Sequence, residues 1–195
     1  FRFAITVLTV FIVLFTACTD DSSGTGLRVG DPYQGGVIAY IFKSGDPGYV
    51  AGETHGLVAA IYDQGSAIPW ASPAVYSEGG TPFSVTGTSP FIGTGAANTD
   101  LIIASNGSGS AYAAGLARAC ADGGYNDWYL PSKNELNELY NNRTAIGSFS
   151  TGSSERYWSS SELSAGRAWT QRFGDGFPDD YDTFRSYRVR AVRSF

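Results

Sequence analysis

The sequence predicts a single α+β domain with small antiparallel sheets, two main helices and long ordered loops. Strand-like runs rich in Val, Ile, Tyr and Phe lie toward both ends of the chain, and two helix signals lie between them. The 25 glycines are concentrated in turn-rich stretches. With 195 residues, of which 43% are hydrophobic, the chain has material for one core and short appendages.

The first half of the domain reads as strands separated by turns. Residues 35–42, with the sequence GGVIAYIF, predict a strand, and the turn sequence SGDPG at 44–48 ends it. Residues 56–62 predict a second strand. From residue 66 to residue 98 there is little periodicity and much Gly, Pro, Ser and Thr, so we expect long ordered loops there.

Two helices are expected in the middle of the chain. The first covers residues 110–120, which are small and apolar, and Asp122-Gly123-Gly124 follow it. The second begins at Ser132, because Ser132 and Glu135 have the spacing of a capping box after Pro131. Its buried stripe is Leu136, Leu139 and Tyr140. The remaining chain returns to strands at residues 156–160, 167–173 and 187–192.

The N-terminal segment predicts export and lipid attachment. Residues 3–17 are a nearly unbroken apolar run preceded by Arg2, shorter than a membrane span, and they end in a lipobox-like sequence before Cys18. We therefore expect a lipoprotein signal peptide at 1–17, acylation of Cys18, and an acidic and polar tether at 18–26 before the domain at 27–195. This places the protein on the bacterial outer membrane or cell surface. The alternative is an ordinary signal peptide or a membrane anchor.

Charge and residue usage argue against several classes of function. Thirteen basic and eighteen acidic residues give a net charge of −5, which disfavours nucleic-acid binding. One histidine and two cysteines exclude zinc sites rich in His and Cys, and also a disulfide scaffold. His55 has no motif that supplies a catalytic partner, Cys120 is expected to pack as a buried thiol, and residues 159–162 lack the context of a nucleophile elbow. We expect neither an enzyme nor a cofactor.

Residues 174–188 are the candidate binding segment. They mix aromatic side chains, arginines and aspartates with Gly and Pro between two predicted strands, and Tyr and Arg are favoured in binding hot spots. Its aspartates lack the spacing of a calcium loop, so no metal is expected. The alternative is a surface loop whose aromatic side chains fold back onto the domain. The predicted ligand-binding residues are Asp175, Phe177, Asp179, Asp180, Tyr181, Asp182, Phe184, Arg185, Tyr187 and Arg188, assisted by Glu162 and Arg167.

From residue 123 onward the chain resembles the C-terminal domain of the Legionella collagen-like protein (Lcl). The matching blocks are residues 127–136 (DWYLPSKNEL), 157–162 (YWSSSE), 168–169 (AW), Phe173 and 189–193 (VRAVR), with upstream agreement at 29–31, 35–37 and 56–58. The resemblance implies a C-type-lectin-like fold of the kind seen in formylglycine-generating enzyme. It also implies a surface or secreted adhesin, whose namesake binds sulfated glycans. It would make Trp128, Trp158 and Trp169 framework residues.

Two departures from related proteins limit what the resemblance implies, and fold analogy then favours binding over oxidation. Asn126-Asp127-Trp128 does not have the residue order of the calcium-dependent sugar motif of true C-type lectins. Formylglycine-generating enzyme needs a cysteine pair, whereas a chain acylated at Cys18 offers only Cys120. The fold and the C-terminal sequence also resemble the variable proteins of diversity-generating retroelements, and every residue of 174–188 can be reached from an Asn codon by the adenine mutagenesis of those systems.

The sequence therefore favours a surface-anchored ligand-binding or adhesion module. Its partners would be a glycan or protein ligand on another cell or host surface, and the membrane through its lipid anchor, but no nucleic acid. Two other classes of function remain as alternatives. One is an enzyme, either of the formylglycine-generating type or a hydrolase, and the other is a structural protein of the cell envelope.

Overall fold

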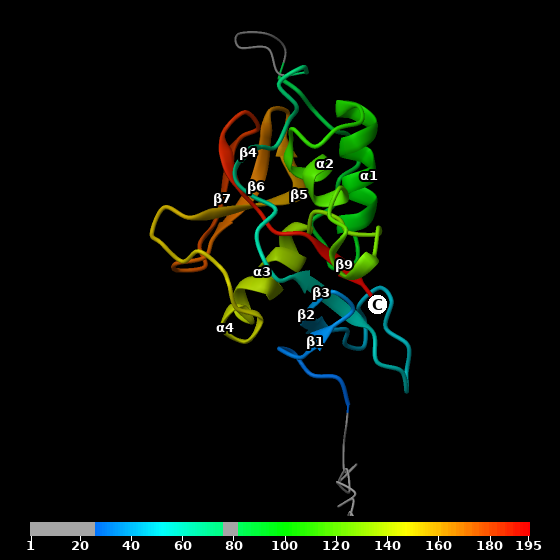
Figure 1. The fold of residues 1–195 in the computed structure, drawn as a ribbon. Coiled ribbons are helices and arrows are strands. Elements are labelled where there is room, and N and C mark those ends of the chain that lie inside the picture. Colours follow the sequence, from blue (N-terminus) through cyan, green and yellow to red (C-terminus); the bar gives the residue numbers. More distant parts are fainter. Residues whose placement is uncertain (1–25, 76–81) are drawn as a thin grey trace, which may run out of the picture.

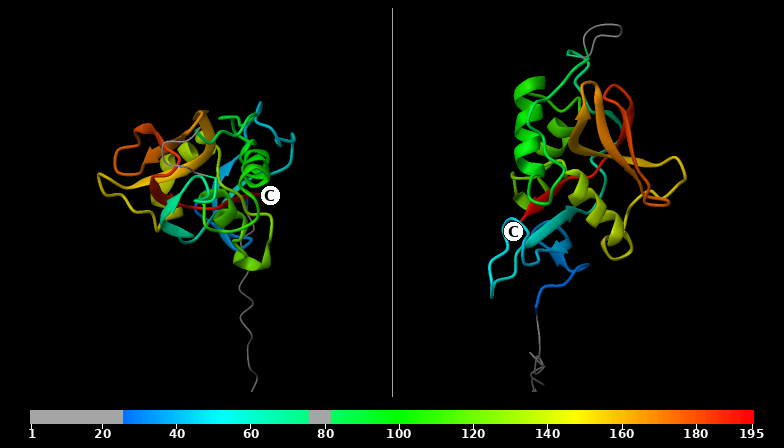
Figure 2. Two further views of the ribbon diagram at one scale, coloured as in Figure 1. Left: turned by 90° about the horizontal axis from the view of Figure 1, so that it is seen from above. Right: turned by 180° about the vertical axis from the view of Figure 1, so that it is seen from behind.

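The computed structural model describes residues 26–75 and 82–195, and its strands form two sheets (Figures 1 and 2). The smaller sheet has the strand order β1-β2-β3-β9, and the larger has the order β4-β8-β5-β6-β7. Residues 1–17, Cys18 and most of the predicted tether lie outside the described residues. The strands are β1 (Pro32–Tyr33), β2 (Gly36–Ile41), β3 (Gly56–Ala60), β4 (Gly65–Pro69), β5 (Arg156–Ser164), β6 (Arg167–Arg172), β7 (Pro178–Asp182), β8 (Ser186–Val189) and β9 (Val192–Ser194).

The two ends of the described chain meet in the smaller sheet. There β9 pairs with β3, with Val58 opposite Arg193, so the last strand completes a sheet begun by the first three. This sheet is antiparallel throughout. In the larger sheet β5 and β8 are parallel where Tyr157 lies opposite Arg188, and the other pairs are antiparallel. The predicted α+β class is confirmed, with this one parallel pair in sheets that were expected to be antiparallel.

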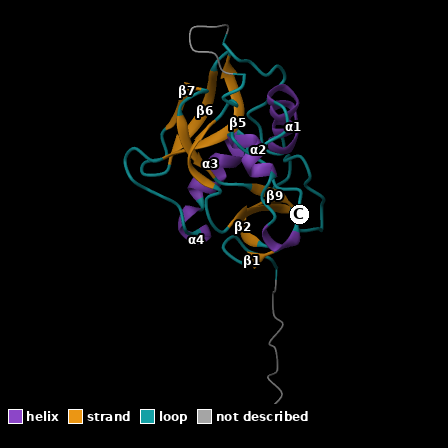
Figure 3. Cartoon of the chain, turned by 45° about the horizontal axis from the view of Figure 1, so that its top comes forward, coloured by secondary structure: helices purple, strands orange, loops and turns teal. Residues whose placement is uncertain are grey.

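Helices pack against both sheets (Figure 3). The described helices are α1 (Gly95–Asn106), α2 (Ala113–Arg118), α3 (Lys133–Asn141) and α4 (Arg143–Ile146), with one 3-10 turn at Asp122–Gly124. The helix predicted at 110–120 is present but begins at Ala113. The predicted start at Ser132 is confirmed, because its hydroxyl accepts from the Glu135 N–H at 3.3 Å and its own N–H donates to the Glu135 carboxylate at 2.8 Å.

Strand β4 and the start of the long helix α1 lie where the sequence predicted loops, and no element was predicted for the rest of α1 at residues 99–106. The buried side of α1 is largely polar, with Asn98 and Thr99 almost fully enclosed, so it has no apolar stripe to mark it as a helix. These polar side chains hold neighbouring segments. Asn98 accepts from the Ser89 N–H at 2.8 Å and donates to the Ser89 carbonyl at 2.6 Å, and the Leu130 N–H donates to Thr99 Oγ1 at 3.0 Å.

The core of the larger sheet is built around buried tryptophans. Trp70 and Trp158 are fully buried, and their indole N–H groups donate to the carbonyls of Ser159 and Ile68, both at 2.8 Å. Because each buried donor has a partner, burial of these rings carries no unsatisfied polar group. Among the tryptophans that the resemblance would make framework residues, Trp128 and Trp158 are fully buried. Trp169 differs: it is half-buried, with the Lys133 ammonium 3.3 Å from its ring centroid.

A buried carboxylate joins the start of α3 to the loop before α1. Glu135 is fully enclosed and accepts from the N–H groups of Ser132 and Gly93, each at 2.8 Å. Burial raises the pKa of Glu135 to about 7, against the opposing effect of these hydrogen bonds. At Gly95 a Cβ atom would lie 2.2 Å from the Glu135 carboxylate, so this junction requires glycine.

Glu135 should make the stability of the domain fall as the pH rises through neutrality. Between the ordinary value of 4.5 and about 7, the folded protein keeps a proton that the unfolded chain has released. This stabilisation is fully present below a pH of 4.5 and is lost above a pH of about 7. Its loss lowers the free energy of unfolding by about 3 kcal/mol. Urea unfolding from acidic to mildly alkaline pH should show this decline, and Glu135→Gln should flatten it. Equal slopes for the two proteins would contradict the assignment.

In residues 26–75 and 82–195, no helix combines the length and the apolar character that a membrane span would need.

Candidate functional site

The candidate binding segment contains a strand that the sequence did not predict. Residues 178–182 form β7, which pairs antiparallel with β6 at the edge of the larger sheet, with Tyr181 opposite Ala168 and Asp180 opposite Trp169. A turn at residues 183–185 leads into β8 (Figure 1). Three of the five residues of β7 are aspartates, which are depleted in strands, and Pro starts it. Neither propensity nor apolar alternation could therefore reveal this strand.

Two aromatic residues of the segment pack inward. The rings of Tyr181 and Tyr187 lie 5.1 Å apart, and Tyr187 packs edge-on against the buried Trp158 at 5.0 Å. The Arg156 guanidinium lies 4.8 Å from the Tyr181 ring centroid. Burial raises the pKa of the Tyr187 hydroxyl. For these two residues the alternative reading is correct: their rings fold back onto the domain.

The predicted aspartates are paired with arginines. Asp179 lies 3.7 Å from the guanidinium of Arg156, Asp175 lies 3.1 Å from that of Arg172, and Asp182 lies 3.1 Å from that of Arg167 and 3.9 Å from that of Arg185. Asp180 also contacts Arg167. Four carboxylates thus face four guanidinium groups, so the surface has no excess of either charge. Within residues 26–75 and 82–195, no group of three or more His, Cys, Asp or Glu side chains could hold a metal ion.

The backbone of β7 is closed to pairing with another strand. Pro178 has no N–H, and the Asp180 N–H donates to the Asp179 carboxylate at 3.0 Å. The Asp180 carbonyl accepts from Arg167 at 3.0 Å, and the Asp182 carbonyl accepts from the Arg185 N–H at 2.9 Å. Edge strands in soluble proteins are protected by such charges, prolines and local hydrogen bonds. Recognition at this edge would therefore depend on side chains.

The aromatic side chains that do face solvent lie just beyond the two ends of β7. Phe177 is 54% exposed and Phe184 is 40% exposed. Each has a guanidinium beside its ring, with Arg172 at 4.9 Å from Phe177 and Arg185 at 5.4 Å from Phe184. Because Arg172 and Arg185 are themselves paired with aspartates, the guanidinium groups beside these two exposed rings are held in place. We call Phe177, Phe184, Arg185 and the Asp–Arg pairs of β7 the edge surface.

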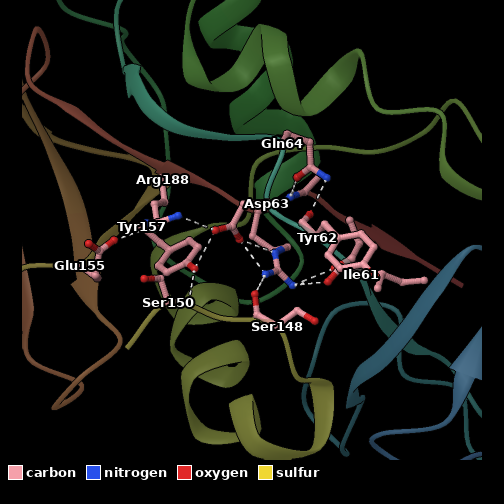
Figure 4. Close-up of polar contacts among 12 residues, drawn as sticks. Ile61, Tyr62, Asp63, Gln64, Ser148, Ser150, Glu155, Tyr157 and Arg188 are labelled. Atoms are coloured by element: carbon pink, nitrogen blue, oxygen red, sulfur yellow. Dashed lines mark hydrogen bonds and ion pairs between the residues drawn. The ribbon is translucent and has the colours of Figure 1, made fainter. Parts of the chain in front are cut away.

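Arg188 is part of a buried charged network instead of the edge surface (Figure 4). Its guanidinium contacts Glu155 and lies 3.2 Å from Asp63. Asp63 also accepts from Arg190 at 2.8 Å and from the Tyr157 hydroxyl at 2.9 Å. Because the Arg188 guanidinium lies between two carboxylates, we assign Arg188 a structural role. No local sequence pattern marks this network, because its members are spread from residue 63 to residue 190.

Glu162 and Arg167, which were predicted to assist binding, make different contacts. Glu162 accepts from the Val85 N–H and the Ser84 hydroxyl, each at 3.1 Å, and burial raises the pKa of its carboxyl group. It therefore holds the loop at 84–85 and does not belong to the edge surface. Arg167 belongs to the edge surface through Asp180 and Asp182. Trp169 lies beside this surface because it is opposite Asp180 in the sheet, and the Lys133 ammonium contacts the Trp169 ring. Neither residue was predicted from the sequence as a site residue.

His55 and Cys120, which were considered for catalysis, make contacts typical of structural residues. The His55 ring contacts the Glu53 carboxylate at 2.8 Å and the Phe195 carbonyl at 3.1 Å, and these contacts raise its pKa. Burial raises the pKa of the Cys120 thiol, which receives a long contact from Gln64 at 3.8 Å. A raised pKa keeps the thiol protonated, unlike that of a reactive cysteine.

Comparison with known proteins identifies the family. The model of the Lcl C-terminal domain matches residues 59–193, which include the larger sheet, α1 to α4 and the edge surface. No curated protein matches the sequence. Since the family model covers more than half of the chain, the chain belongs to the Lcl C-terminal domain family.

Proposed function

We propose that this protein is a bacterial surface lipoprotein that binds a glycan or protein ligand on another cell or host surface, without catalysis. Membership of the Lcl C-terminal domain family supports a surface-associated binding module. The observation that carries the proposal is the edge surface, where Phe177 and Phe184 are exposed just beyond the two ends of β7, a strand closed to pairing. Exposed aromatic rings beside fixed arginines are the usual energetic centres of interfaces.

The charge balance of the edge surface bears on the class of ligand. Its four guanidinium groups are each matched by a carboxylate, and the whole chain carries a net charge of −5. A polyanion such as a sulfated glycan gains affinity from an excess of positive charge, which this surface lacks. We therefore propose that the ligand is an uncharged glycan or a protein surface that contacts the aromatic rings.

Arrays of neutral glycans, sulfated glycans and surface proteins test this proposal. The purified protein should bind a neutral glycan or a protein, with an affinity that changes little between low and moderate salt, because few counterions are displaced. Binding confined to sulfated glycans, with a steep loss of affinity in salt, would contradict it.

The arrangement of the domain suits display from a membrane. In Figure 1 the turn between β7 and β8 lies at the end of the molecule opposite β1, near which the described chain begins. A lipid on Cys18 would leave a tether of about nine residues before the domain, which reaches at most about 30 Å. The end of the edge surface at this turn would then lie away from the bilayer.

Replacing Cys18 by alanine should release the protein from membranes. Several acyl chains on Cys18 give stable anchoring, and the mutant chain, which has no thiol at residue 18, would carry none there. Metabolic labelling with a palmitate analogue should tag the wild-type protein, and Cys18→Ala should abolish both the tag and the membrane retention. If the mutant stays in the membrane fraction, the apolar segment itself is the anchor.

We also propose that a retroelement diversifies the exposed part of residues 174–188. Phe177, Phe184 and Arg185 are exposed, and substitution at such positions costs little stability. Thr183, by contrast, is only 1% exposed and would tolerate few replacements. Sequencing of the flanking DNA should find a reverse transcriptase gene and an adenine-rich near-copy of the 3′ end. Their absence would rule out this mechanism and leave the binding proposal standing.

A further inference from the structure

A second concave surface lies on the smaller sheet, away from the edge surface. This groove has a volume of about 600 Å³ and is open to solvent. Two tyrosines, Tyr33 and Tyr62, contribute aromatic rings to its lining, and Ile61 and Pro32 contribute aliphatic surface. Tyr62 is 70% exposed and Ile61 is 41% exposed, which is unusual for two adjacent large apolar side chains.

Hydrogen bonds to the backbone and packing of the Tyr33 ring hold the lining of the groove in place. The Ile61 carbonyl accepts from the buried Arg190 at 3.1 Å, and the Tyr62 carbonyl accepts from Gln64 at 2.9 Å. Figure 4 shows the Ile61 and Tyr62 side chains on the side of the charged network away from Arg188. The Tyr33 ring packs edge-on against Phe195 at 4.9 Å. A buried polar network therefore fixes the backbone that presents these side chains, which lowers the entropy lost on binding.

Two glycines let the walls of this groove approach each other closely. Gly35 has a φ of +84°, and a Cβ there would lie 2.5 Å from the Asp122 carbonyl and 2.7 Å from the Gly123 Cα. Gly123 has a φ of +67° and approaches Gly35 equally closely. The two backbones thus meet without side chains between them, and both residues line the groove.

The charge of the groove is negative. Asp122 lines it, is exposed, and forms no ion pair with any basic side chain of residues 26–75 and 82–195. The nearby Arg193 contacts Gln34 in the lining, but its charge is matched by Asp127, which accepts from it at 2.7 and 2.8 Å. The groove therefore combines two tyrosine side chains with one carboxylate that has no ion-pair partner among the described residues.

We propose that this groove binds a quaternary ammonium group of the choline type. The faces of aromatic rings attract cations, and a carboxylate supplies the opposite charge. A primary ammonium has three N–H donors that lose water against Tyr33, Tyr62 and Ile61, whereas a trimethylammonium group has none and presents methyl groups to these side chains. The chemistry of the lining thus favours the methylated cation over the primary one.

Titration of the purified protein with choline, followed by NMR of the amides at residues 32–36 and 61–64, tests this site. Choline should shift these amides, and its neutral isostere, in which carbon replaces nitrogen, should bind at least about tenfold more weakly. Ethanolamine should also bind more weakly than choline. Phosphocholine and a trimethyl-lysine peptide, titrated in parallel, distinguish a headgroup from a protein side chain as the carrier of the group.

Variants separate the groove from other surfaces. Tyr62→Ala and Asp122→Asn should each weaken choline binding at least about tenfold with unchanged thermal unfolding. Tyr49→Ala, which removes a tyrosine 40% exposed outside the groove lining, and Phe184→Ala on the edge surface should leave it unchanged. Failure of choline to shift the groove amides, or equal binding of choline and its isostere, would overturn the proposal. So would a loss of affinity in Tyr49→Ala as large as that in Tyr62→Ala.

Discussion

Replacing Asp63 by alanine should destabilise the domain by about 3–5 kcal/mol, because it removes the shared carboxylate of a buried charged network. The Arg190 side chain is fully buried, and Asp63 is its only carboxylate partner among the described residues. Arg190 donates to Asp63 Oδ1, and the other carboxylate oxygen, Oδ2, accepts from Arg188 and from the Tyr157 hydroxyl. Without Asp63, the buried Arg190 guanidinium would keep its charge with only backbone carbonyls and the face of the Phe149 ring as partners.

A surface ion pair provides the matched control for this prediction. Asp100 contacts Arg118 at 2.5 Å, but its side chain is 70% exposed, so Asp100→Ala should change stability by less than about 1 kcal/mol. Urea unfolding measures both variants. If Asp63→Ala does not fold, Asp63→Asn should fold with reduced stability, since the amide retains one acceptor. Equal stabilities of Asp63→Ala and Asp100→Ala would show that the network contributes nothing beyond a surface pair.

Replacing Trp158 by alanine should destabilise the domain by about 3–5 kcal/mol, which is enough to unfold a marginal domain. Trp158 is fully buried, donates to the Ile68 carbonyl at 2.8 Å and supports the Tyr187 ring. Tyr181 lies in the next layer outward, against Tyr187 and Arg156. Because it is half-buried, Tyr181→Ala should cost about 1–2 kcal/mol, an intermediate loss.

Thermal unfolding of the alanine variants measures how much each ring contributes to the stability of the domain. The expected order of stability loss is Trp158→Ala, then Tyr181→Ala, then Phe184→Ala, with the last within about 0.5 kcal/mol of wild type. This order follows the distance of each ring from the core. A loss in Phe184→Ala as large as that in Tyr181→Ala would place Phe184 in the core and remove it from the edge surface.

The sequence predicts those elements whose local signals and tertiary environment agree. The start of α3 is marked by Ser132 and Glu135, whose side chains form the capping box that the spacing requires. Strands β2 and β3 are marked by apolar runs that are in fact buried. In each case the residues that favour the element locally are also those that stabilise it in the fold, so pattern and structure coincide.

The elements that the sequence did not reveal are stabilised by polar contacts over long sequence separations. Helix α1 buries Asn98 and Thr99 because partners at Ser89 and Leu130 satisfy them, and no local pattern specifies those partners. Strand β7 is rich in aspartate because arginines of β5 and β6 neutralise it. The candidate segment was located by its composition, but composition could not tell that Tyr181 and Tyr187 point inward while Phe177 and Phe184 point outward.

The most direct test of the edge surface is the ligand affinity of Phe184→Ala beside that of Phe91→Ala. Phe91 is 64% exposed and lies outside the candidate segment, so it controls for loss of an exposed ring. With the ligand found on the arrays, Phe184→Ala should weaken binding by about 2 kcal/mol or more, roughly thirtyfold, while Phe91→Ala binds as the wild type does. Wild-type affinity in Phe184→Ala, or an equal loss in both variants, would contradict the assignment of the binding site to the edge surface.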